Sequence, residues 1–248
     1  MRERALSAVP APVIWLLAGA FCAQLALKAF EPRPQARAAD LPPAPPASTL
    51  RLLDLGEPIG TAQLLSLYLQ AFDTQPGINI PFRDLDYDAV VAWLDRVVDL
   101  DPAGQYPLLM ASQVYSQVPD EARQRRMLAW VESRFREDPD RRWRWLGHAA
   151  ILAKHKLHDL PLALRYAQEL HRLATGPSVP DWAKQMHIFL LEDMGERETA
   201  RILLGGLLAS GTISDEHEIL FLTERLKTMG GADENSSGST ESRLPKRR

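Results

Sequence analysis

The longest apolar stretch of the chain lies close to its amino end. No charged residue occurs between Ala5 and Leu27. Because a helix of roughly 20 residues crosses the ~30 Å hydrocarbon layer of a bilayer, the pattern predicts a short tail at 1–10 and one transmembrane helix at 11–30. Trp15 and Lys28 lie near the ends of this segment, where bilayer interfaces favour such side chains.

A cleaved signal peptide is the alternative interpretation of the same segment. The small residues in Ala36-Arg37-Ala38 resemble a processing site, and cleavage after Ala38 would give a secreted soluble protein. That site lies well beyond the apolar run and follows Pro32 and Pro34. We therefore favour the uncleaved membrane anchor.

Two segments lack the pattern of a folded domain. Residues 31–48 contain six prolines and five alanines, which predicts an extended Pro/Ala-rich linker over 31–57. At the other end, residues 230–248 are polar and predict a disordered tail. A linker of this kind holds a folded domain away from the bilayer, as in bacterial inner-membrane proteins with a periplasmic domain.

Residues 58–229 repeat their apolar positions at helical spacing, without sustained alternation, and so predict an all-α domain. Proline, glycine and aspartate separate the apolar segments and predict where each helix ends. The predicted helices occupy 60–72, 87–100, 104–117, 120–137, 140–156, 159–174, 180–194, 196–209 and 214–228.

These helices are self-similar at a fixed period. The segments Leu100-Asp101-Pro102 and Glu137-Asp138-Pro139 are 37 residues apart, and so are Ala163 and Ala200. A period in the thirties with two helices per unit is typical of helical repeat proteins.

The repeated unit resembles the tetratricopeptide (TPR) repeat. Trp143-x-x-Leu146-Gly147 matches the W-x-x-L-G opening of its first helix, and Met194 to Leu204 matches the turn and the second helix. The resemblance covers about residues 58–228. It implies a right-handed α-solenoid of about four helix pairs, closed by a C-terminal capping helix.

The resemblance also implies a groove that binds extended peptides. If Trp143 opens a first helix, the residues at helical spacing around it face that groove, and arginine there suits the carboxylates of an acidic protein or peptide partner. The candidate groove residues are Arg141, Arg144, Trp145, His148, Trp182 and Gln185.

Charge is distributed unevenly along this domain. Residues 54–101 hold nine acidic and two basic residues, whereas residues 123–144 hold eight arginines and four acidic residues. We expect most of these arginines to pair with nearby carboxylates. The formal net charge of the chain is -3, and no groove-reading motif accompanies the arginines, so nucleic acid is not an expected partner.

The sequence holds few candidates for chemistry. One cysteine excludes disulfide scaffolds and thiolate metal sites, and the nucleophile-elbow, phosphate-loop and H-E-x-x-H motifs are absent. The histidines are the remaining candidates: a metal-binding protein or an enzyme would use His148, His155, His158 and His171. Lys154 and Lys156 beside them disfavour a bound cation, so we expect no metal and no cofactor.

Together these patterns predict a membrane-anchored, non-catalytic adaptor or scaffold of a bacterial envelope complex. It would lie in the inner membrane as a single-pass protein, with its repeat domain in the periplasm. The partner's identity, the biological process and the oligomeric state are left open by the sequence.

Overall fold

The computed structural model describes most of the chain and divides it into two units. It describes residues 10–30, 40–54, 56–75, 78–213 and 215–237, with backbone only for residues 30 and 230–237. One unit comprises Met1–Ala39 and Asp73–Ile80, and the other Asp40–Phe72 and Pro81–Arg248. The processing site predicted at Ala38 and the tail beyond residue 237 lie outside the described residues.

The first unit contains one long helix and a minimal hairpin. Helix α1 (Ala11–Phe30) is long and apolar enough to cross a membrane, although a signal sequence close to the amino terminus meets the same criterion. Between the helices predicted at 60–72 and 87–100, β1 (Thr74–Gln75) pairs with the antiparallel β2 (Ile78–Asn79). The Ile80 amide donates to the Asp73 carbonyl oxygen at 2.7 Å and closes this hairpin.

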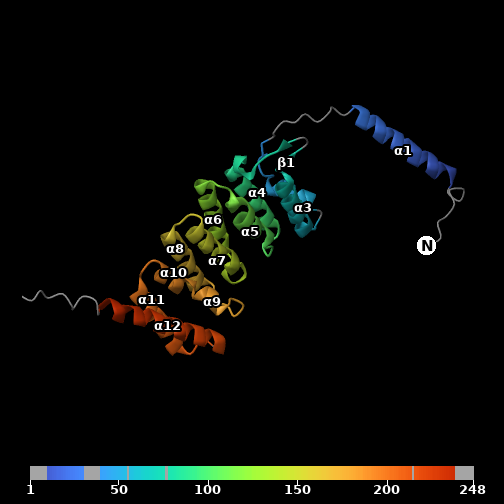
Figure 1. The fold of residues 1–248 in the computed structure, drawn as a ribbon. Helices are drawn as coiled ribbons and strands as arrows, with labels where there is room; N and C mark the ends of the chain where they lie inside the picture. The colour runs from blue at the N-terminus through green and yellow to red at the C-terminus, as the bar shows by residue number, and fades with distance from the viewer. Residues whose placement is uncertain (1–9, 31–39, 55, 76–77, 214, 238–248) are drawn as a thin grey trace, which may run out of the picture. The chain divides into compact units, whose positions relative to one another are not determined.

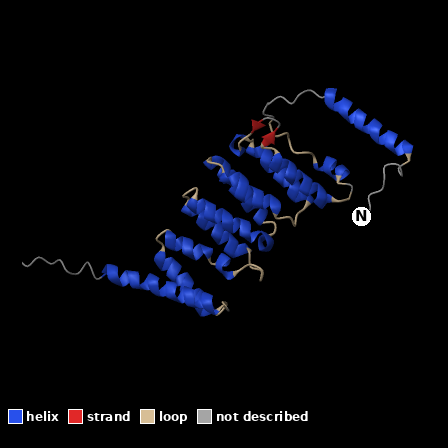
Figure 2. Cartoon of the chain, turned by 45° about the vertical axis from the view of Figure 1, so that its right-hand side comes forward, coloured by secondary structure: helices blue, strands red, loops and turns tan. Residues whose placement is uncertain are grey.

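The second unit is built from helices, as the periodicity predicted (Figures 1 and 2). The predicted helix at 180–194 is divided at Gln185, and the one at 104–117 continues through a π-helical and a 3-10 turn. The elements are α2 (Ala47–Leu53), α3 (Pro58–Ala71), η2 (Phe82–Asp84), α4 (Tyr87–Leu100), α5 (Tyr106–Leu109), η3 (Met110–Val114), η4 (Tyr115–Gln117), α6 (Glu121–Phe135), α7 (Pro139–His155), α8 (Leu160–Leu173), α9 (Asp181–Lys184), α10 (Met186–Asp193), α11 (Arg197–Ser210) and α12 (Glu216–Ser237).

Each of these helices packs mainly on helices close to it in the chain. α3 packs on α4, α4 on α6, α6 on α7 and α7 on α8. The series continues with α8 on α10, α10 on α11 and α11 on α12 (Figure 1). Helices that are neighbours in the chain are therefore also neighbours in space within this unit.

Aspartate side chains define where four of the helices begin. A carboxylate at the N-cap accepts a hydrogen bond from a backbone N–H that the first helical turn leaves without a partner. Asp138 and Pro139 combine this cap with proline at the first helical position of α7. The N-cap residues are Asp86 for α4, Asp120 for α6, Asp138 for α7 and Asp159 for α8.

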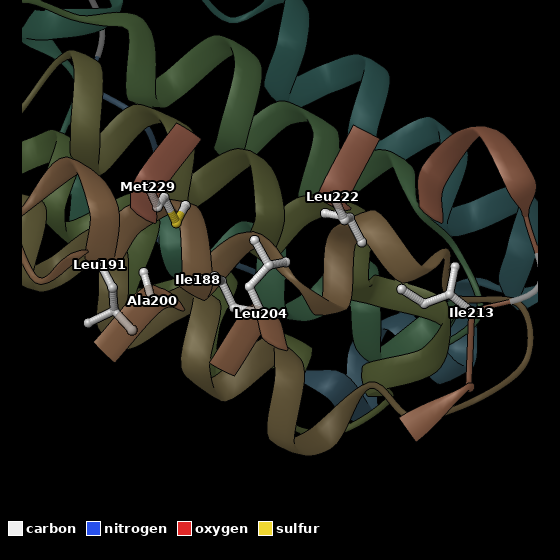
Figure 3. Packing of buried hydrophobic residues seen from close by; sticks show 7 residues of the cluster. All are labelled: Ile188, Leu191, Ala200, Leu204, Ile213, Leu222 and Met229. Atoms are coloured by element: carbon white, nitrogen blue, oxygen red, sulfur yellow. The ribbon is translucent and has the colours of Figure 1, made fainter. Parts of the chain in front are cut away.

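The carboxyl-terminal helices enclose an apolar core of their own. Ile188 and Leu191 of α10, Leu204 of α11 and Leu222 of α12 point toward one another (Figure 3). Ala200, at the start of α11, is fully buried among them. Burial of these side chains holds the last three helices together.

The predicted linker at 31–57 is corrected in its second half. Residues 47–53 form α2, and the preceding segment docks on α4: the Trp93 indole N–H donates to the Pro42 carbonyl oxygen at 2.8 Å, and Arg96 Nε donates to that of Pro45 at 3.0 Å. Leu41 and Leu50 are buried. Proline keeps its carbonyl acceptor, and side chains of α4 use these acceptors to bind an extended segment.

The tail predicted to be disordered at 230–248 is corrected in its first part. Helix α12 continues through Gly230 and Gly231 to Ser237, so the polar tail predicted at 230–248 begins within a helix. Met229, the last residue before this extension, is buried against the core of the carboxyl-terminal helices.

Ion pairs between helices explain the uneven charge of the sequence. Two aspartates of α4 form ion pairs with arginines of α6. Two arginines and a glutamate in or just after α6 form ion pairs with oppositely charged residues in or just before α8. The partners lie 33 to 39 residues apart in the chain. These pairs are Arg126–Asp88, Arg134–Asp95, Arg125–Asp159, Arg136–Glu169 and Arg165–Glu132.

Candidate functional site

One side of α7 carries three of the six side chains that the sequence assigned to a partner-binding groove. Arg141, Arg144 and His148 follow one another at the spacing of a single helix face, and Ile151, 46% exposed, continues the row. The two arginines are exposed and His148 is half-buried. The sequence therefore located a solvent-facing side of this helix.

Arg144 is the arginine of this face that no carboxylate neutralises. Within the described residues, the other seven arginines of 123–144 each form an ion pair, whereas none joins Arg144 to a carboxylate. Its guanidinium carbon lies 5.4 Å from the ring centroid of Trp143. The guanidinium N–H groups of Arg144 are thus available to bind a carboxylate in two-point fashion.

Trp182 extends this charged face with an exposed aromatic ring. It is the second residue of α9, and its indole lies edge-on to that of Trp143, with ring centroids 5.5 Å apart and planes at 77°. The Trp182 side chain is 54% exposed, whereas Trp143 is buried at 8%. We call Arg141, Arg144 and Trp182 the α7 patch.

The indole of Trp145 is held by a hydrogen bond within the helical unit. Its indole N–H donates to Gln105 Oε1 at 2.6 Å, which ties α7 to the residue preceding α5. The side chain is half-buried. Of the two tryptophans among the candidate residues, Trp182 is therefore the one with an exposed ring.

The remaining two candidates, His148 and Gln185, are less accessible. Burial lowers the pKa of His148, the Ser112 carbonyl opposes this shift, and Nε2 of His148 is buried without a hydrogen-bond partner in the described part of the chain. Gln185 is only 4% exposed. Its burial removes Gln185 from any surface that includes the α7 patch.

The histidines of the metal hypothesis are dispersed. His158 lies in the turn between α7 and α8 with φ of 51°, a left-handed conformation. His171 of α8 contacts His187 of α10 instead of His148 or His155. Among the described residues, no group of three or more His, Cys, Asp or Glu side chains has a geometry that could hold a metal ion.

Sequence reasoning did not single out His187, which lines a cavity of about 420 Å³ with His171. Their ring centroids are 4.3 Å apart, and burial together with the nearby His171 lowers the pKa of His187 to about 4. The two histidines are 16 residues apart on different helices, so no local pattern marks the pair. Ile188, Leu203, Leu207 and Ile213 supply apolar walls of this cavity.

Comparison with known proteins adds no relative to these observations. No protein-family model, curated protein or solved structure matches the chain significantly. The geometry of the site itself therefore carries the functional argument. The Arg144 guanidinium and the exposed indole of Trp182 both contact the Trp143 ring, and together they are suited to binding a carboxylate and an apolar group.

Proposed function

We propose that this protein is a membrane-anchored, non-catalytic adaptor that binds an acidic segment of a partner protein through the α7 patch. The observation that carries the proposal is Arg144, which has no carboxylate partner among the described residues although the other seven arginines of 123–144 each have one. The exposed Arg144 lies over the ring of Trp143, which also contacts the half-exposed Trp182, and this combination resembles the arginine and aromatic anchors of protein interfaces.

We further propose that the helices form a TPR-like solenoid, with the α7 patch on its groove. Two turns support a structural repeat: His158, between α7 and α8, and Gly195, between α10 and α11, are 37 residues apart and both have positive φ. In both turns an amide just after this residue donates back to the end of the preceding helix, from Asp159 to Ala153 and from Glu196 to Leu191. The same period therefore appears in the backbone and in the sequence.

The proposed membrane anchor is α1, with the helical unit in the bacterial periplasm. The length and composition of α1 support it, and the absence of cysteine after residue 22 suits an oxidising compartment. The secreted form is the competing outcome. An intact-mass measurement of protein isolated from cells distinguishes them, because a mature chain that begins at Ala39 contradicts the anchor.

The α7 patch is tested by charge reversal in the full chain. Arg141→Glu combined with Arg144→Glu is expected to abolish capture of the partner by tagged protein, measured by quantitative mass spectrometry of material bound in membrane extracts. Arg197→Glu, at an exposed arginine of α11, is the matched control and should capture the partner normally.

Folding is monitored in the same samples. Both α7 arginines are exposed, so helicity by circular dichroism and the melting temperature should change little. Partner capture that is equal in the double variant, the control and the unmodified protein contradicts the proposed function.

A further inference from the structure

Helix α3 has an exposed face without charge. Its 14 residues, PIGTAQLLSLYLQA, include no Asp, Glu, Lys or Arg. Ala62, Ser66 and Leu69 are buried on the inner side, against the rest of the helical unit. A surface helix ordinarily carries charged residues on the side that faces water, so the outer side of α3 has the composition of a covered surface.

Large apolar side chains occupy that outer side. Ile59 is 54% exposed, Leu64 68% and Leu67 58%, with Tyr68 at 44%. Tyr106, 41% exposed, extends the surface from α5, because its hydroxyl donates to Gln70 Oε1 at 2.6 Å. We call these five residues, with Gln63 and Gln70 between them, the α3 face.

A cavity of about 420 Å³ opens beside the α3 face. Ala62, Ser66 and Leu67 line it from α3, and Val97 and Pro107 line it from the neighbouring helices. Asp101 is the one charged residue in its lining. The cavity is large enough to accept an aliphatic side chain from a helix packed on the α3 face.

The size of this surface suits an interface between two copies. The exposed parts of the five side chains amount to roughly 500 Å² per copy, comparable with the largest apolar patch of an ordinary monomer. With the glutamines between them, the surface approaches the ~800 Å² that each partner contributes to a standard interface.

The chemistry of the α3 face is also self-complementary. A two-fold interface brings the same groups of both copies together, so a charged residue at its centre would meet its own like charge. The α3 face offers only apolar groups, two phenols and amides, and each glutamine amide can donate to and accept from its counterpart. A partner recognised by charge would require ionic groups that this face does not have.

We propose that the protein forms a two-fold dimer in which α3 packs against α3 of a second copy, with an aliphatic side chain of each copy in the cavity of the other. Leu64, the most exposed residue of the face, lies near its centre. The α7 patch shares no residue with this surface, so the dimer and the partner-binding function are independent.

Two differently tagged full-length copies, co-expressed and extracted in mild detergent, test the dimer. Unmodified copies are expected to co-purify, and Leu64→Glu in both is expected to reduce recovery of the second copy at least tenfold. The matched control is Ile202→Glu on α11, because that isoleucine is similarly exposed at 63% and should leave recovery unchanged. Circular dichroism verifies that both variants remain helical.

Cross-linking in intact membranes provides a second measurement that does not depend on the glutamate variant. Leu64→Cys in a Cys22→Ala background is expected to form a cross-linked species of twice the chain mass, whereas Lys227→Cys on α12 should not. Three results overturn the proposal: unmodified copies that do not co-purify, Leu64→Glu copies that still do, or cross-linking of Leu64→Cys to a different protein.

Discussion

The imidazole rings of His171 and His187 bind one and the same carbonyl oxygen. Nδ1 of His171 lies 2.9 Å and Nδ1 of His187 lies 3.0 Å from the Lys184 oxygen. A carbonyl oxygen only accepts hydrogen bonds, so each ring donates to it from Nδ1. Protonation of His187 adds a charge to a buried ring beside a second histidine, which the fold opposes.

This arrangement predicts a stability that depends on pH. The pKa of His187 is lowered from 6.5 to about 4 in the folded state, so the unfolded chain binds more protons between these values. The contribution of His187 to the free energy of unfolding is therefore fully present above pH 6.5. It is lost as the pH decreases toward 4, by about 3 kcal/mol in total. Denaturant unfolding of the full chain in detergent at a series of pH values measures the slope.

The variant His187→Gln isolates this contribution from that of the carboxylates. It should reduce the slope between pH 6.5 and 5, where few carboxylates titrate, and the slope that remains includes the contribution of His148, whose pKa burial also lowers. His217→Gln, at an exposed histidine of α12, serves as the control and should retain the slope. Equal slopes in both variants would show that the pH dependence comes from other groups.

Glycine in place of His158 should stabilise the protein. The left-handed conformation at φ of 51° costs a residue with a Cβ atom roughly 1 kcal/mol, a cost that glycine avoids. Gly195→Ala at the equivalent turn should lose a similar amount, although no atom lies within 4 Å of the added Cβ. Thermal unfolding of the two variants is expected to shift in opposite directions, and a shift of the same sign in both contradicts the backbone explanation.

Alanine in place of Gly147 should also stabilise the protein. The TPR resemblance suggests that glycine is needed here for close helix packing, but an added Cβ would lie 3.6 Å from Leu170 Cδ1 and 3.6 Å from Met186 Cε, which is ordinary contact. Removing glycine from the interior of α7 should then gain roughly 0.5–1 kcal/mol.

Gly176→Ala is the contrasting substitution. Its Cβ would come within 2.6 Å of the Asp140 carboxylate, which accepts a hydrogen bond from the Gly176 amide at 2.8 Å. That variant should be destabilised, measured by the same thermal unfolding. A melting temperature that falls in Gly147→Ala would instead support a steric requirement for glycine in α7.

The buried Arg142 should dominate the stability of the arginine-rich segment. Its side chain is 2% exposed; Nη1 donates to Glu137 Oε2 at 2.7 Å and Nη2 to the Pro102 carbonyl oxygen at 2.9 Å. Arg142→Ala leaves a cavity and a carbonyl oxygen without its donor, at a cost of roughly 3 kcal/mol. Arg126→Ala, which breaks an exposed pair with Asp88, should cost under about 1 kcal/mol.

Urea unfolding of these two variants measures the difference. Arg142→Lys is informative as well, because one ammonium group lacks the planar arrangement of donors with which the guanidinium contacts both partners. Equal losses for Arg142→Ala and Arg126→Ala would contradict a special role for the buried arginine.

The helices and their boundaries could largely be predicted because their signals are local. The apolar spacing of residues 87–100 coincides with α4, and aspartates before α4, α6, α7 and α8 act through amides two or three residues away. The apolar composition of residues 11–30 likewise identified α1 as a candidate span. Each of these signals involves residues within a few turns of one another.

The tertiary structure decided which side chains are exposed and which partners they have. Arg142 and Arg144 are alike in sequence, yet one is buried and donates to the carbonyl oxygen of Pro102, 40 residues away, whereas the other is exposed over the ring of Trp143. Gln185 and His187 are likewise buried by helices that a local pattern does not identify. Hydrophobic spacing thus determined the helices, whereas packing between distant segments determined which of their charged and aromatic groups reach the surface, because burial depends on the neighbours of a helix as well as on its own sequence.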